Sequence, residues 1–61
     1  MKLEKLQRHL RRYGCHLARQ GARHSIWINP ANGESTAVPR HREVDDRLVA
    51  AICRHLDVPP P

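Results

Sequence analysis

The sequence is short and has few aromatic residues, glycines and cysteines, which argues against a large protein or one with an enclosed site. It contains 61 residues, with three glycines, two cysteines, one tyrosine, one tryptophan and no phenylalanine. A chain of this length forms one domain, here residues 1–61, and buries only about 60% of its unfolded surface. It has no room for a deep pocket or a cofactor-binding unit. A functional site should therefore lie on an open face, which favours a large substrate or a partner surface.

Membrane and disulfide signals are also missing. No apolar run approaches the ~20 residues of a membrane span. The beginning of the chain is polar and charged from Lys2 to Arg12, unlike a signal peptide. Cys15 and Cys53 lie far apart in segments that look core-facing, so we expect free buried thiols and no disulfide framework. These features predict a cytoplasmic domain.

Positive charge is what the chain has in excess. Lys and Arg number 11 against 6 Asp and Glu, a net charge of +5, and all the cations except Lys2 and Lys5 are arginine. The planar guanidinium donates two parallel hydrogen bonds to a phosphate. The excess of positive charge points first to nucleic acid as the binding partner. An anionic membrane or an acidic protein is a less favoured partner. Solubility alone explains the charge about as well.

The pattern of apolar and turn residues predicts two helices and three strands. Residues 2–13 place Leu3, Leu6, Leu10 and Tyr13 on one stripe of a helix that Gly14 closes. Strands are predicted at 15–20, 24–29 and 35–39, the last ended by Pro39, joined by a turn at 20–22 and a two-residue Asn32-Gly33 hairpin turn. Such short connections make the sheet an antiparallel meander.

A second helix follows the third strand. Its apolar stripe is formed by Val44, Leu48, Val49, Ile52, Cys53 and Leu56. Asp45 and Asp46 suit its N-terminus, and we expect the proline-rich segment 57–61 to be a frayed tail. The fold class is therefore α+β in the order α-β-β-β-α. Both helices should cover one face of the three-stranded antiparallel sheet and leave the other face open.

Two of the five histidines stand beside arginine at strand boundaries. Arg23-His24 opens the second strand, and Arg40-His41 follows the third. Because adjacent strands are antiparallel, both pairs belong to the same end of the sheet. Histidine titrates closest to neutral pH and arginine stabilises charge on phosphate, so such a cluster could move protons on an RNA 2′-hydroxyl. Judged from spacing alone, a histidine at the end of a strand is more often simply exposed to solvent than catalytic.

The other candidates for chemistry are weaker. His9 and His55 lie on polar helix sides, and His16 is expected on the open sheet face. No metal is expected, because no ligand spacing typical of zinc occurs among Cys15, His16, His24, His41, Cys53 and His55. Ser25 has no recognisable base and acid partner. Trp27 could stack on a base or fill the core.

Several segments together resemble the HicA-type (YcfA-like) toxins, the small mRNA interferases of bacterial toxin–antitoxin pairs. The resemblance covers nearly the whole chain. It rests on "YGCHLARQGARHSIWINP", on "VPRHREV", which is close to a "VPRH" segment of that family, and on the "LVAAICRHLDV" helix. The family commonly has Gly-Ser before the strand histidine, where this chain has Ala22-Arg23, and an aromatic residue at the position of Cys15.

The resemblance implies a fold like that of double-stranded-RNA-binding domains and cleavage of mRNA without a metal or other cofactor. It assigns the catalytic role to His24. It also implies a HicB-type antitoxin that covers the active face. Together with the charge pattern, it leads us to expect RNA contacts from four residues: Arg19, Arg23, Arg40 and His41. The alternatives are a non-catalytic RNA-binding module on the same face and a protein that only docks an acidic partner.

Overall fold

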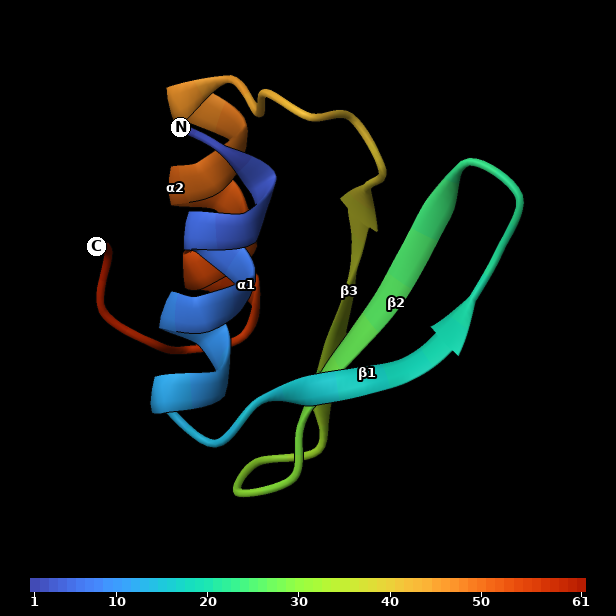
Figure 1. The fold of residues 1–61 in the computed structure, drawn as a ribbon. Helices are drawn as coiled ribbons and strands as arrows, with labels where there is room; N and C mark the ends of the chain where they lie inside the picture. The colour runs from blue at the N-terminus through green and yellow to red at the C-terminus, as the bar shows by residue number, and fades with distance from the viewer.

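The computed structural model describes residues 1–61. It contains α1 (Leu3–Arg12), β1 (His16–Gln20), β2 (His24–Asn29), β3 (Glu34–Pro39) and α2 (Asp46–His55). The strands form one antiparallel sheet in the order β1-β2-β3. Figure 1 shows α1 and α2 on the same side of the sheet, where both contribute to one hydrophobic core. The predicted α+β fold with the order α-β-β-β-α is confirmed.

Helix α1 buries the middle of its predicted stripe. Leu6 and Leu10 are fully buried. Gly14 has φ +85°, and its N–H donates to the Arg11 carbonyl, so the expected glycine closes the helix. Tyr13, predicted on the apolar stripe of the helix, is 43% exposed and lies outside the core. The helix ends before Tyr13, whose ring packs against the His9 ring at a centroid distance of 5.0 Å.

Helix α2 begins two residues later than its apolar pattern. The Asp45 carboxylate caps it by accepting a hydrogen bond of 2.7 Å from the Arg47 N–H. Val44 is buried but lies in the connection before the helix. The prediction that Leu48 is a core residue was wrong, because its side chain is 40% exposed. Val49 faces the core instead, one residue and about 100° further round the helix.

The end of α2 contains the only non-glycine residue with a positive φ. Asp57 has φ +57°, and its N–H donates to the Arg54 carbonyl at 3.2 Å. The next N–H, of Val58, donates to the Cys53 carbonyl at 2.9 Å. This is the hydrogen-bond pattern that glycine usually closes at a helix end. An aspartate in this left-handed conformation costs free energy that glycine would not.

The β2–β3 connection is longer than predicted. Asn29 pairs with Glu34, so the loop contains four residues, 30–33, and not the two-residue Asn32-Gly33 turn. The loop closes by a 2.8 Å hydrogen bond from the Gly33 N–H to the Asn29 carbonyl, and Gly33 has φ +76°. The strand after it begins at residue 34, one residue earlier than expected.

Asn29 joins this loop to the end of α2. Its side chain is 5% exposed, and its amide nitrogen donates to the Leu56 carbonyl at 2.8 Å. Its amide oxygen accepts from the Ala31 N–H at 3.1 Å. Asn32 adds a second donor to the Leu56 carbonyl at 3.2 Å. The helix end is thereby capped by side chains from the end of β2 and from the loop that follows it.

The two faces of the sheet differ as the alternation predicts. The core lies between the sheet and the helices and contains Leu6, Leu10, Cys15, Trp27, Val38, Val44, Val49, Ile52, Cys53 and Leu56. In β2, Ser25 and Trp27 face this core, whereas His24 and the half-buried Ile26 and Ile28 lie on the other face. No helix is both long and apolar enough to span a bilayer.

A β-bulge interrupts the alternation in β1. Leu17 pairs with Trp27 and Arg19 pairs with Ile26, so Ala18 is an extra residue without a partner. Directly opposite residues share a face of the sheet. The bulge therefore turns Arg19 to the open face, although strict alternation from Leu17 would turn it toward the helices.

Candidate functional site

The two Arg-His pairs meet at one end of the sheet. Ala22, Arg23, His24, Arg40 and His41 line an open surface depression of about 530 Å³. The register explains the meeting, because His24 pairs directly with Pro39, the residue before Arg40. All five lining residues are exposed. Such an opening admits a segment of a large molecule and does not enclose a small one.

The β1–β2 turn fixes the backbone of His24. The Gly21 N–H donates to the His24 carbonyl at 2.8 Å. A Cβ atom at position 21 would lie 2.9 Å from this same oxygen, which is closer than real Cβ atoms come. Glycine is therefore required by a close backbone approach. The sequence marks Gly21 as a turn residue but does not reveal this contact.

Arg40 holds the turn from the other side. Its Nη1 atom donates to the Gly21 carbonyl at 2.9 Å and to the Ala22 carbonyl at 3.4 Å. Its backbone N–H donates to the Arg23 carbonyl at 3.3 Å, which extends the β2–β3 pairing beyond Pro39. The sequence predicts Arg40 only as an RNA contact and does not reveal this structural role.

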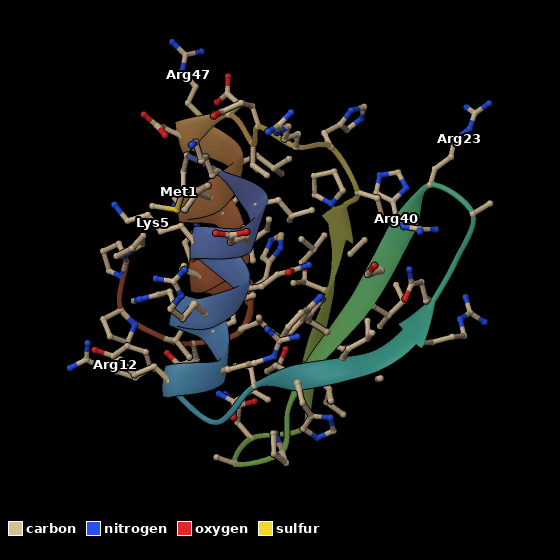
Figure 2. The ribbon with its side chains drawn as sticks, in the orientation of Figure 1. Met1, Lys5, Arg12, Arg23, Arg40 and Arg47 are labelled. Carbon is tan, nitrogen blue, oxygen red and sulfur yellow. The ribbon has the colours of Figure 1, made fainter.

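Unlike Arg40, Arg23 makes no side-chain hydrogen bond to the turn. Its guanidinium has no ion pair or hydrogen bond, and Figure 2 shows the side chain extending from the turn into solvent, at the same end of the sheet as Arg40. Arg23 can therefore bind an anion without first breaking an internal contact. Nη2 and Nε of Arg40 make no internal hydrogen bond either, so that side chain can hold the turn and an anion together.

His41 lies in a connection that is anchored on both sides. Before it, the Arg40 N–H binds β2; after it, the Arg42 carbonyl accepts a 2.9 Å hydrogen bond from the Leu3 N–H. Lys2 and Glu43 form an isolated antiparallel bridge beside this bond. The backbone of His41 is thus held while its side chain stays exposed.

Arg19 stands apart from the other predicted site residues. The bulge places it on the open face with His24, but it does not line the depression. His16 pairs with Ile28 and so lies on the open face, as predicted. Trp27 does not offer its ring to a nucleic acid, because it is 1% exposed and the Arg11 guanidinium covers it at 5.1 Å. Filling the core is its role.

The groups with shifted pKa values lie outside the depression. Burial raises the pKa of the Cys15 and Cys53 thiols, so both stay protonated and are poor nucleophiles at neutral pH. A hydrogen bond to Asp46 raises the pKa of the Met1 ammonium, which also donates to the Val44 carbonyl. No three His, Cys, Asp or Glu side chains gather closely enough to hold a metal ion.

Comparison with protein families adds one match. The family model described as the HicA toxin of bacterial toxin-antitoxin systems matches residues 3–58. The chain belongs to the HicA toxin family. No curated protein and no solved structure matches it.

Membership makes the chain the toxin component of a toxin–antitoxin system, and the partner of a HicA toxin is in general a HicB-type antitoxin. The resemblance drawn from the sequence is therefore confirmed. The matched range contains all five residues that line the depression.

Proposed function

We propose that this HicA toxin is an endoribonuclease that cleaves mRNA and so arrests translation and growth. The observation that supports it best is the depression in which His24 and His41 stand with Arg23 and Arg40. Two imidazoles that can accept or donate a proton and two phosphate-binding cations suit the cleavage of RNA. The open shape of the depression suits a polymer.

The reaction uses the RNA 2′-hydroxyl as its nucleophile. His24 is the general base that takes the proton from the 2′-hydroxyl, and the 2′-oxygen then bonds to the adjacent phosphorus. The bond from phosphorus to the 5′-oxygen breaks, and that oxygen takes a proton from His41. The products are a 2′,3′-cyclic phosphate and a 5′-hydroxyl. Two imidazoles account for both proton transfers, so the proposal needs no metal or other cofactor.

The arginines stabilise the charge that develops on the phosphate. Arg23 is free to bind a non-bridging oxygen, and Arg40 offers the part of its guanidinium that does not hold the turn. Arg19 contacts the RNA further along the open face. The HicB-type antitoxin neutralises the toxin by covering this face, including the depression.

The test compares wild type, His24→Ala and the control His55→Ala, since His55 is an exposed histidine outside the depression. Under tight induction, wild type and the control should arrest growth and deplete intact mRNA. The His24→Ala variant should not, and its purified form should cleave RNA about 10²–10⁴-fold more slowly. Chelator should leave the rate unchanged.

Growth arrest by His24→Ala equal to that of wild type would refute the catalytic role of His24. If no variant arrests growth or cleaves RNA, while the wild type binds RNA with a steep salt dependence, the protein is a non-catalytic RNA-binding module. If it neither cleaves nor binds RNA, its basic face serves only to dock the antitoxin.

A further inference from the structure

A second concentration of cations lies on the side of α1 that faces away from the core. Lys5, Arg8 and Arg12 are exposed and follow one another at spacings of three and four residues, so they share one side of the helix. With His9 and Pro61 they line a second open depression of about 300 Å³. None of these residues belongs to the site formed by Arg23, His24, Arg40 and His41.

The charges on this side of α1 are not balanced within the protein. Glu4 pairs with Arg8 at 3.6 Å, but Lys5 and Arg12 have no acidic partner. Like charges three or four residues apart repel each other and weaken a helix. Lys5 and Arg12 therefore carry positive charge that the protein itself does not neutralise and that a bound polyanion would neutralise.

An exposed tyrosine ring and a half-buried histidine ring continue the same side of the helix. The His9 and Tyr13 rings lie 5.0 Å apart at an angle of 57°, and Tyr13 is 43% exposed. A hydrogen bond of 2.7 Å between His9 Nε2 and the Pro59 carbonyl fixes the histidine ring against the tail. Cations that follow a backbone, beside rings on which bases stack, are the combination that binds single-stranded nucleic acid. An acidic protein would need the cations but not the rings.

We propose that this surface of α1, formed by Lys5, Arg8, His9, Arg12 and Tyr13, is a second contact for the single-stranded RNA substrate. The inference rests on the proposed ribonuclease function. Figure 2 shows Lys5 and Arg12 on one side of the molecule and Arg23 and Arg40 on the opposite side. A short RNA in the first depression does not reach α1, whereas a longer strand that passes round the domain does. The surface therefore favours long RNA over short RNA.

The experiment measures binding and cleavage of two single-stranded RNAs, of about 4 and about 16 nucleotides. The test variant is Lys5→Gln/Arg12→Gln, and the control is Arg47→Gln/Arg54→Gln, which removes the same charge from exposed positions on α2. Binding is measured in the His24→Ala background to prevent cleavage. Thermal melting confirms that each variant is folded.

Loss of two phosphate contacts should lower the salt dependence, the slope of log K against log[salt], by about 1.4 in magnitude on the 16-mer. At ~0.1 M salt this corresponds to a loss of about 25-fold in affinity. The ratio of kcat/KM for the long RNA to that for the short RNA should fall in the test variant and not in the control. Tyr13→Leu keeps an apolar side chain and should weaken 16-mer binding by about fivefold or more, through lost stacking.

Three outcomes would overturn the inference. One is an equal loss of 16-mer affinity in both double variants, which means an effect of net charge alone. Another is an unchanged long-to-short ratio in Lys5→Gln/Arg12→Gln while wild type cleaves both RNAs, which leaves the ribonuclease function intact. The third is a Lys5→Gln/Arg12→Gln variant that keeps the wild-type affinity for the 16-mer. A wild type that cleaves neither RNA refutes the proposed function instead.

Discussion

Replacing Gly21 by alanine should disturb the site through one backbone contact. The new Cβ would lie 2.9 Å from the His24 carbonyl oxygen, whereas ordinary contacts begin at 3.4 Å. The turn must therefore shift by about 0.5 Å, or the 2.8 Å hydrogen bond between Gly21 and His24 must lengthen. Because both partners are backbone atoms in a paired hairpin, neither can move as a flexible side chain would.

Two opposing free-energy terms decide the effect of Gly21→Ala on stability. Overpacking typically costs about 1–3 kcal/mol. Alanine restricts the unfolded chain, which stabilises the folded state by about 0.4–1 kcal/mol where the backbone conformation is permitted. The overpacking cost is larger, so we expect a net loss of about 1 kcal/mol. In a domain of this size that lowers Tm by about 4–8 °C.

Cleavage should suffer more than stability. Misplacement of a catalytic group by about 1 Å costs roughly 10²-fold in rate, so a shift of half that size should cost about tenfold. The assay is RNA cleavage by purified protein well below Tm, with thermal melting followed by circular dichroism. Gln20→Ala, at the exposed preceding residue, is the matched control. If Gly21→Ala melted no lower than wild type and cleaved at the wild-type rate, the reasoning from this contact would be refuted.

Three further predictions concern stability. Asp57→Gly should stabilise by about 1 kcal/mol and raise Tm, because glycine adopts the positive φ of this position at no steric cost; an unchanged Tm would contradict it. Asn29→Ala should cost about 2 kcal/mol in urea unfolding, since it removes a buried donor to the Leu56 carbonyl and leaves a backbone N–H unpaired; a loss below ~0.5 kcal/mol would argue against the cap. Burial raises the pKa of Cys15 and Cys53, so the unfolded chain releases these protons at lower pH than the native state. Their contribution to stability is complete below about pH 8.5 and is lost as pH rises through the raised pKa values, and Cys15→Ala/Cys53→Ala should reduce this alkaline loss in urea melts.

The element order could be predicted because the hydrophobic period changes clearly along the chain. Leu6 and Leu10 stand at helical spacing, and β2 alternates between buried and half-buried residues. The errors lie where an element begins or ends. Leu48 lies four residues after Val44, so helical spacing predicts that both face the core. The helix begins only after its cap at Asp45, however, so Val44 is not helical and does not show which side of the helix is buried.

The site could be predicted only as far as strand topology reaches. Antiparallel pairing brings His24 and Arg40 to one end of the sheet, and this follows from the sequence. The bonds from the Arg40 guanidinium to the turn do not, because they depend on a side-chain conformation and on the path of the turn. The same holds for the close approach at Gly21, where spacing reveals a turn but not which atoms touch.

The bulge at Ala18 has a consequence for how relatives of this toxin are aligned. In a HicA toxin without the extra residue, the position opposite Ile26 would directly follow the counterpart of Leu17. An alignment that opens no gap there would match Arg19 to a residue whose side chain points toward the helices. Absence of a cation at that column would then be mistaken for loss of the RNA contact proposed for Arg19, although a cation at the equivalent place on the sheet would stand one column earlier.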